Sequence, residues 1–509
     1  MQSSASSARA ARCSDMKRYS IPGCLLLLAL GGCSTPPPAT ARVADPTASG
    51  AGPLAPPTGL AEKAAAGDGW AALETITKRI APPTFPNRDC SITDHGAVAG
   101  GVKDATEAIR SAIAACSAQG GGRVVVPPGV FLTGAIHLES NINLHVSEGA
   151  TLRFSTDPAA YLPVVLTRWE GIECMNYSPL IYALDRENVA ITGAGTLDGQ
   201  ASDENWWKWA RKSPGQASLA SPDAKTLNEM ADSGTPVPER VFGAGHHLRP
   251  NFIQTYRSKN VLIEGVTLLR SPMWEVHPVL STNVTVRQLK ITSHGPNNDG
   301  CDPDSSSDVL IDSCLFDVGD DCIAIKSGRN TDGRRVGRPS ENIIVRNSTM
   351  KDGHAGVAIG SEISGGASNI FIENNRMDSP HLDRALRLKS NARRGGTIEN
   401  VYMRNVEIGK VSEAVLTIDF LYEEGPKGDF PPTARNIVLE NVKASAAPRL
   451  FFIQGFEGAT IDGIRAANSE IVGATATEVI EHAGHIELDH VTLLPETRAR
   501  SASSRVGPQ

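Results

Sequence analysis

The sequence has no excess of positive charge. Its 509 residues include 49 Lys and Arg against 56 Asp and Glu, which gives a formal net charge of -7. Proteins that bind nucleic acid usually carry a basic surface, so this balance argues against that class of partner. If the substrate is itself a polyanion, the overall field of the protein opposes its approach. Local Lys, Arg and His side chains must then supply the attraction.

Long apolar runs are also missing. The short run at residues 24–30 cannot span a bilayer as a mature helix, and it follows a positively charged stretch. This pattern predicts a signal peptide over residues 1–32. The run ends in Leu30-Gly31-Gly32-Cys33, which resembles the bacterial lipoprotein processing site and implies a lipid on Cys33; the alternative is ordinary cleavage nearby. We expect an exported protein, sorted to the outer membrane because Ser34 follows, whose only membrane contact is this anchor.

Two further segments lack the composition of a folded core. Residues 33–84 are rich in Pro, Ala and Thr, and residues 497–509 form a polar tail. Such composition cannot bury enough apolar surface to fold, so the first segment is interpreted as a tether. One folded unit is therefore expected over residues 85–496.

Cysteine spacing that would indicate a zinc site is absent. Six cysteines follow Cys33: Cys90, Cys116, Cys174, Cys301, Cys314 and Cys322. In an exported protein one or two disulfides are possible, although a sequence cannot give their connectivity. The alternative is that several of them are small buried apolar residues.

A short phrase recurs through the second half of the chain: a polar residue, usually Asn, followed by alternating apolar residues. Between residues 260 and 436 its copies start 23 to 36 residues apart, and helical signals are scarce there. A period of this size with β-branched alternation predicts an all-β solenoid, in which each coil buries its apolar face against the next. The copies begin at Asn188, Asn260, Asn283, Asp308, Asn342, Asn369, Asn400 and Asn436.

One short helix is expected before the repeats. Residues 104–118 place Ala and Ile on one face, with Asp104 as the N-cap. Such a helix would cover the first coil, whose strands would otherwise offer an open edge.

Four motifs fall at the same interval as the coils. Their key residues Asp299, Asp320, His354 and Arg387 are 21, 34 and 33 residues apart, so they should line up on one face. The motifs are Asn297-Asn298-Asp299, Gly319-Asp320-Asp321, Gly353-His354-Ala355-Gly356 and Arg387-Leu388-Lys389.

The adjacent carboxyls Asp320 and Asp321 suit glycoside hydrolysis. That reaction needs one protonated carboxyl to donate to the leaving oxygen and one carboxylate to activate water. Two such close groups cannot both ionise at their ordinary pKa, so one of the pair is expected to stay protonated. Asp321 shares the parity of Ile323 and Ile325 in a regular strand, so it can face a groove only if the pair lies at a bend. Gly319 makes such a bend possible.

Together these motifs resemble those of glycoside hydrolase family 28, the polygalacturonases. The family signatures are Asn-Thr-Asp, Gly-Asp-Asp, Gly-His-Gly and Arg-Ile-Lys, in this order. The sequence departs from them only at Asn298, Ala355 and Leu388, which lie between the functional positions. The resemblance implies a single-domain, right-handed parallel β-helix. It also implies inverting hydrolysis of α-1,4-galacturonosyl linkages in pectin, an acidic polysaccharide.

The resemblance also implies a role for each residue. Asp320 would be the general acid, Asp299 and Asp321 would hold the attacking water, and His354 would tune the acid. The substrate would be bound by Asn297, Arg387, Lys389 and Tyr422. This chemistry requires no metal and no cofactor.

Exo-action is expected because insertions interrupt the coil pattern. Residues 199–249 and 329–340 are long enough to close one end of a groove and leave a pocket for terminal sugars. Two other classes remain open: a Ca²⁺-dependent pectate lyase on the same fold, and a β-helix that binds glycans without cutting them.

Overall fold

The computed structural model describes residues 69–212 and 216–495. The predicted signal peptide, the lipidation site Cys33 and most of the predicted tether lie outside the described residues, as does the polar tail. No helix in the described ranges has the length and apolar character needed to cross a membrane.

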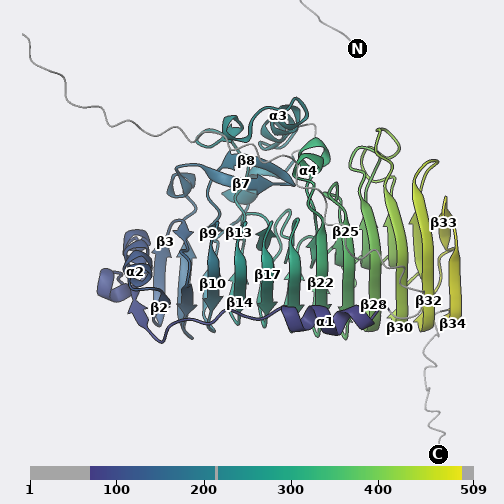
Figure 1. Cartoon of the computed structure of the whole chain (residues 1–509), viewed down its shortest axis with the longest axis horizontal. Coiled ribbons are helices and arrows are strands. Elements are labelled where there is room, and N and C mark those ends of the chain that lie inside the picture. The colour runs from purple at the N-terminus through teal and green to yellow at the C-terminus, as the bar shows by residue number, and fades with distance from the viewer. Residues whose placement is uncertain (1–68, 213–215, 496–509) are drawn as a thin grey trace, which may run out of the picture. The chain divides into compact units, whose positions relative to one another are not determined.

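Parallel strands of successive coils stack into three ladders that form a right-handed parallel β-helix, as predicted (Figure 1). Alternate side chains of each strand point into the stack; Ile343 and Val345, for example, are fully buried. The first ladder contains β1 (Asp89–Ser91), β2 (Gly122–Val126), β5 (Ile142–Val146), β10 (Glu187–Thr192), β14 (Lys259–Glu264), β17 (Thr282–Arg287), β19 (Ser307–Asp312), β22 (Ser340–Arg346) and β25 (Ala367–Glu373).

The second ladder lies beside the first and later merges with it. It contains β3 (Gly129–Thr133), β6 (Ala150–Phe154), β11 (Thr196–Asp198), β15 (Thr267–Leu269), β18 (Lys290–Ser293), β20 (Leu315–Val318), β23 (Thr349–Asp352) and β26 (Arg376–Met377). From β28 onward, single long strands serve both ladders: β28 (Thr397–Lys410), β30 (Thr433–Ala446), β32 (Thr460–Val472) and β34 (Ile486–Leu494).

The third ladder is the one that carries the predicted site. Its strands are β4 (Ile136–His137), β9 (Ile181–Leu184), β13 (Ile253–Tyr256), β16 (Val276–Val279), β21 (Ala324–Ile325), β24 (Ala355–Ile359), β27 (Arg384–Lys389), β29 (Ala414–Asp419), β31 (Phe451–Gln454) and β33 (Val479–Glu481). Residues 301–304 lie between β16 and β21 in this ladder. Cys301 and Asp304 form isolated bridges to β16 on one side and to Ile323 and Lys326 on the other.

The recurring Asn has a structural role at the start of each first-ladder strand. Asn260, Asn283 and Asn342 all have φ near 57°, a left-handed conformation that Asn tolerates better than most residues. The Asn283 side-chain amide donates to that of Asn260, and Asn260 donates to Asn188. These contacts form a ladder of stacked amides from coil to coil, which accounts for the repeated residue.

Helix α2 (Thr106–Ala118) covers the first coil as expected (Figure 1). It buries Ile109, Ala112 and Ile113 and contacts β1 and β2. The helix begins two residues later than predicted. Asp104 still caps the turn, because its carboxylate accepts the Thr106 N–H at 2.7 Å.

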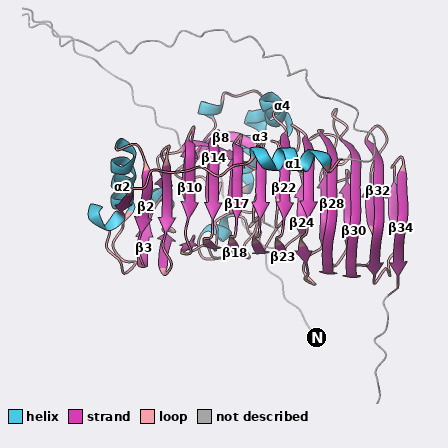
Figure 2. Cartoon of the chain, turned by 60° about the horizontal axis from the view of Figure 1, so that its bottom comes forward, coloured by secondary structure: helices cyan, strands magenta, loops and turns pink. Residues whose placement is uncertain are grey.

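The predicted tether boundary at residue 85 is wrong, because helix α1 (Ala71–Arg79) packs against the coils. It lies along the outside of the stack in both views (Figures 1 and 2). Leu73, Ile76 and Ile80 contact outward-facing apolar side chains such as Ile344 and Phe371. Their spacing is that of one face of a helix, a signal that the surrounding Pro-rich composition obscured.

A second layer covers part of the third ladder (Figure 1). Its core is a sheet of β7 (Val165–Trp169), β8 (Ile172–Asn176) and β12 (Val241–Phe242), with α3 (Ser221–Asp232) and α4 (Asn330–Val336) beside it. Four 3-10 turns complete the described elements: η1 (Ile92–His95), η2 (Pro158–Tyr161), η3 (Trp206–Trp209) and η4 (Val237–Glu239). The six cysteines of the described ranges are all free thiols, five of them buried.

Candidate active site

Three carboxyl groups from two successive coils meet on the outer side of the third ladder. Asp299 lies between β18 and β19, and Asp320 and Asp321 lie between β20 and β21. One carboxylate oxygen from each lies within 4.8 Å of the others. The coil spacing of these residues therefore places them together, as the sequence predicted.

The turn that carries Asp299 is held by its neighbour. The Asn298 amide oxygen accepts from the Ser293 hydroxyl and the Gly295 N–H, at 2.8 and 2.7 Å. The amide nitrogen donates to the carbonyls of Ser271 and Met273. The amide oxygen and nitrogen of this buried side chain are both satisfied, by one hydroxyl and three backbone groups, so the departure from Thr at this position leaves a well-fixed turn.

Asp320 and Asp321 lie at a bend before the strand proper, as the parity argument required. Strand β21 starts only at Ala324, and the Asp321 N–H donates to Asp320 Oδ1 at 3.0 Å. Asp320 remains partly accessible, whereas Asp321 is fully buried. The bend thus presents Asp320 to a ligand and directs Asp321 into the cluster.

His354 contacts Asp320 through both its ring and its backbone. Its Nδ1 lies 2.9 Å from Asp320 Oδ1, and its N–H donates to the Asp320 carbonyl at 3.0 Å. Gly353 permits this approach: it has φ of 147°, and a Cβ there would lie 2.5 Å from the same carbonyl oxygen. The His354 ring is about half exposed and faces the accessible side of the acid.

Lys389 and Arg387 reach the cluster from β27. Lys389 Nζ lies 2.7 Å from Asp321 Oδ2, and both side chains are buried. Arg387 lies on the same face but forms no ion pair within the described ranges, and its buried Nε has no hydrogen-bond partner. Tyr422 lies on the next coil, with its ring centre 5.4 Å from Arg387 and 5.6 Å from Lys389. Of the three residues Lys389 contacts a carboxyl of the cluster directly, and Arg387 and Tyr422 lie beside one another and beside Lys389.

Asn297 is held by a residue of the long insertion. Arg249 donates from Nη2 to Asn297 Oδ1 at 2.7 Å, and from Nη1 to the carbonyls of Pro272 and Pro296. Burial lowers the pKa of Arg249 to about 10, against the opposing charges of Glu170, Asp299 and Asp320. One side-chain oxygen of Asn297 is therefore occupied, which leaves its amide N–H groups for a ligand.

The proton distribution differs from the expected one. Burial would raise the pKa of Asp320, but the hydrogen bond and charge of His354 hold it below its usual value. The same hydrogen bond raises the pKa of His354. Burial and the charges of Asp320 and Asp302 raise the pKa of Asp299 well above its usual range. The lowered pKa of Asp320 goes against the expectation of a protonated carboxyl at that residue, and the raised pKa of Asp299 means that its ionised form is disfavoured unless a cation lies beside it.

Comparison with known proteins identifies the family. Glycosyl hydrolases family 28 matches residues 243–485. The hyperthermoactive exopolygalacturonase from Thermotoga maritima is 47% identical, with a TM-score of 0.81 over 84% of this chain and 96% of that one. The chain belongs to glycoside hydrolase family 28. A probable polygalacturonase from Vitis vinifera is 29% identical over 76% of this chain and 77% of its own length. An exo-poly-alpha-D-galacturonosidase from Dickeya chrysanthemi is 27% identical over 70% of this chain, which spans 62% of that protein.

The carboxyls of this family 28 hydrolase are closer together than a general rule for inversion suggests. Inverting glycosidases usually hold their two carboxyls about 6.5–9.5 Å apart. Here the nearest oxygens of Asp299, Asp320 and Asp321 lie within 4.8 Å. Stacking on adjacent coils brings the groups closer than the expected gap. Three carboxyls are present instead of two, so water can be held by a pair of them.

Two groups of side chains have donor atoms that could hold a cation. They are Asp299, Asp320 and Asp321, and His294, Asp317 and Asp352. In the first group Lys389 and Lys326 already lie within 4 Å of Asp321 and Asp299. In the second, Lys351 pairs with Asp317 at 2.9 Å. Lysine side chains thus supply positive charge where a Ca²⁺-dependent lyase would require the metal.

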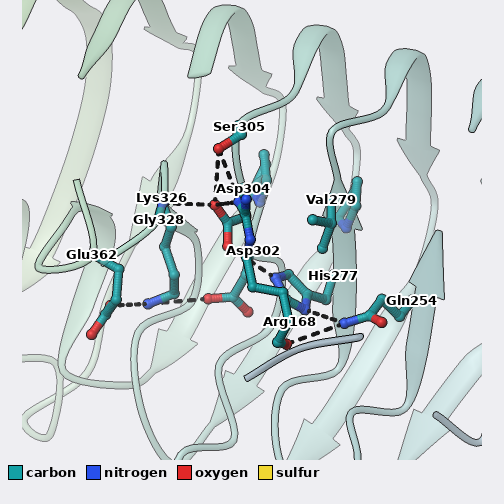
Figure 3. A network of polar contacts seen from close by, with 12 residues as sticks. Arg168, Gln254, His277, Val279, Asp302, Asp304, Ser305, Lys326, Gly328 and Glu362 are labelled. Atoms are coloured by element: carbon teal, nitrogen blue, oxygen red, sulfur yellow. Dashed lines mark hydrogen bonds and ion pairs between the residues drawn. The ribbon is translucent and has the colours of Figure 1, made fainter. Parts of the chain in front are cut away.

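Sequence reasoning missed the hairpin β7–β8, which covers the third ladder next to the site. Its Arg168 is fully buried and donates to Asp304 and Ser305 at 2.8 and 2.9 Å (Figure 3). Glu170 and Gly171 form its turn, both with positive φ, as in a type I′ turn. The Glu-Gly pair between alternating residues was the signal that could have revealed this hairpin.

Other aromatic and His side chains near the site are buried or half-buried. His277, on β16, is contacted by the amides of Asn251 and Gln254. In the 199–249 insertion, Trp206 is buried against Tyr161, and the indole N–H of Trp207 donates to the Ser271 carbonyl. These contacts account for the three side chains as packing residues.

Proposed function

We propose that this hydrolase cleaves α-1,4-galacturonosyl linkages of polygalacturonate by inverting, exo-acting hydrolysis. The observation that carries the proposal is the convergence of Asp299, Asp320 and Asp321 beside His354. Lys389 contacts the same cluster, and Arg387 lies two residues before it on the same strand; together they supply the local positive charge that an anionic substrate requires. The polygalacturonase relatives support the same substrate.

We assign Asp320 as the general acid, and Asp299 and Asp321 as the pair that activates water. The Asp320–His354 pair shares one proton, and Asp320 is the partly accessible member that meets the glycosidic oxygen. Proton donation to that oxygen breaks the bond to the leaving sugar. Water attacks from the side of Asp299 and Asp321, and one of these carboxylates takes its proton. Asp321 is favoured in its ionised form by the ion pair with Lys389.

Substrate carboxylates are assigned to Arg387, with Lys389, Asn297 and Tyr422 lining the same place. Arg387 is the cation of this set without a protein counter-ion in the described ranges, so its guanidinium can meet a galacturonate group directly. Lys389 divides its charge between Asp321 and the ligand. A neutral sugar would leave Arg387 unpaired, which favours an acidic substrate.

Exo-action is supported by the hairpin β7–β8. Thr167 donates to Gln254, and Arg168 binds Asp304, which lies beside Lys326 in the ladder. A polysaccharide lying across successive coils would meet this hairpin directly beyond Asp299. Both insertions strengthen the hairpin: β12, from residues 199–249, pairs with β8, and α4, from residues 329–340, adjoins β8. The exo-acting relatives from Thermotoga maritima and Dickeya chrysanthemi support the same mode.

Viscosity tests the mode of cleavage. An exo enzyme removes terminal units, so polygalacturonate should keep most of its viscosity while reducing ends accumulate. A rapid fall in viscosity with few new reducing ends would establish internal cleavage. Ultraviolet-absorbing unsaturated products that disappear with a chelator would assign the protein to the lyases. Binding without any product would assign it to the glycan-binding β-helices.

The anchor is a separate proposal that rests on Leu30-Gly31-Gly32-Cys33. We propose that the enzyme is exported and held at the outer membrane by a lipid on Cys33, with a tether before α1. Growth with labelled palmitate should label the wild type, and Cys33→Ala should abolish the label. Equal labelling of both proteins would refute lipidation at this cysteine.

A further inference from the structure

Lys326 is a buried lysine beneath the carboxyl cluster, directly after β21. Its Nζ lies 3.3 Å from Glu362 Oε2, 3.5 Å from Asp302 Oδ1 and 3.7 Å from Asp299 Oδ2 (Figure 3 shows Lys326, Asp302 and Glu362). It also lies 4.4 Å from the ring centre of Trp274. Lys326 is 3% exposed, so its ammonium is enclosed by protein.

The carboxyl groups around Lys326 outnumber the positive charges beside them. Three carboxyls, those of Asp299, Asp302 and Glu362, surround one ammonium, and among the described residues only Glu362 has a second cation within 4 Å, Arg329 at 3.7 Å. In the same part of the chain neither oxygen of Asp302 has a hydrogen-bond partner, nor has Asp299 Oδ1. Within the described ranges, Lys326 is the only basic side chain within 4 Å of Asp299. The ionised form of Asp299 therefore depends on this lysine.

We propose that Lys326 is a positioning residue that fixes the Asp299 carboxylate and supplies the positive charge that its ionised form requires. The inference rests on the proposed function, in which Asp299 helps to activate water. Lys326 is too buried to touch substrate, so any effect on catalysis passes through Asp299. Asp302 competes with Asp299 for the same ammonium and opposes its ionisation.

The alternative is a buried ion network that only stabilises the fold. The two roles differ in their effect on pH dependence. The charged groups that face Asp299 are Asp302 on its own coil, Asp320 and Asp321 on the next coil, Lys326, and the more distant Arg249 of the insertion. Removing the nearest cation, Lys326, must make Asp299 harder to ionise, and removing one anion must make it easier. A purely structural role would shift neither.

The test compares Lys326→Met, Lys326→Arg and Asp302→Asn, with Lys351→Met as a control lysine whose exposed ammonium pairs with Asp317, outside the carboxyl cluster. Activity of the wild type on polygalacturonate is measured first, so that failure of the proposed function is recognised separately. In Lys326→Met we expect kcat to fall by about 10²-fold or more, KM to change little, and the acid limb of the kcat profile to move to higher pH. Lys326→Arg should recover part of kcat.

Asp302→Asn should shift the acid limb of kcat in the opposite direction, and this variant keeps the buried cation in place. Its acid limb should move to lower pH, while Lys351→Met should match the wild type. An unchanged acid limb in folded Lys326→Met overturns the proposal. If that variant does not fold, an acid limb of Asp302→Asn that stays in place or moves to higher pH overturns it instead.

Discussion

His354 Nδ1 lies 2.9 Å from Asp320 Oδ1, and this hydrogen bond shifts the two pKa values in opposite directions. The carboxylate is the partly accessible member of the pair, and the imidazole favours its ionised form. In the proposed mechanism the pair must deliver its proton through Asp320 to the leaving oxygen, while the buried Asp299 and Asp321 act on the water.

Replacing Asp320 should remove the acid without disturbing the fold. We expect Asp320→Asn to lower kcat on polygalacturonate by several orders of magnitude, because general acid catalysis alone accounts for about 10²–10⁴-fold. Asp317→Asn is a matched control on the same coil, where the carboxylate contacts His294 and Lys351 instead. Near-wild-type turnover by folded Asp320→Asn would remove the assignment.

His354 should set the basic limb of the pH profile. Its raised pKa means that the pair keeps its proton until the pH passes that pKa, after which the acid is lost. In His354→Gln the proton must be held by Asp320 itself, so the descending limb of kcat should move to lower pH. The measurement is kcat against pH for both proteins, and an unmoved descending limb would exclude this role.

The two cations of β27 should differ in their kinetic effects. Arg387→Ala should mainly raise KM, and more for galacturonan than for its fully methyl-esterified form, because it loses the contact with a substrate carboxylate. Lys389→Ala should also lower kcat, because it leaves the fully buried Asp321 without its counter-ion. Steady-state kinetics on both substrates distinguish them. Identical kinetic changes in the two variants would mean that the structure's pairing of Lys389 with Asp321 has no catalytic consequence.

A buried carboxyl outside the cluster should affect stability alone. Burial raises the pKa of Glu275 to about 8, whereas an unfolded Glu has a pKa of about 4.3. Between these values the folded protein keeps a proton that the unfolded chain releases, so wild-type stability is lost as the pH rises. Glu275→Gln removes this loss. Its Tm should exceed that of the wild type by an amount that grows from pH 4 to pH 8, and a constant difference would contradict the assignment.

The sequence predicted much of this site because the solenoid converts regular spacing into proximity. Asp299, Asp320 and His354 recur at about one coil each, so their alignment followed from the period alone. The Asp320–Asp321 bend could be foreseen from parity and Gly319. Lys326 could not be recognised in the same way. Its burial depends on how side chains of three other coils, those of Trp274, Asp302 and Glu362, pack around it, and no motif in the sequence marks that packing.

The amino-acid composition around α1 led to a wrong domain boundary, because the helical pattern there is short. The segment containing α1 was assigned to the tether because Pro and Ala dominate its surroundings, although Leu73, Ile76 and Ile80 mark one helical face. The groove was expected to be closed by residues 199–249 or 329–340. Both contribute, but the hairpin β7–β8 is the part that contacts Gln254 and Asp304. Which insertion lies on the ladder depends on tertiary packing that a single sequence does not encode locally.

The most direct test of the central claim is proton NMR of polygalacturonate during the first minutes of digestion, before the anomers equilibrate. The anomer that forms first distinguishes inversion from retention. The size of the first product tests the terminal cleavage that the hairpin β7–β8 predicts. We predict that free galacturonate is the first product and that its new reducing end appears as the β anomer. An initial α anomer, or a mixture of longer oligosaccharides without the monomer, would contradict it.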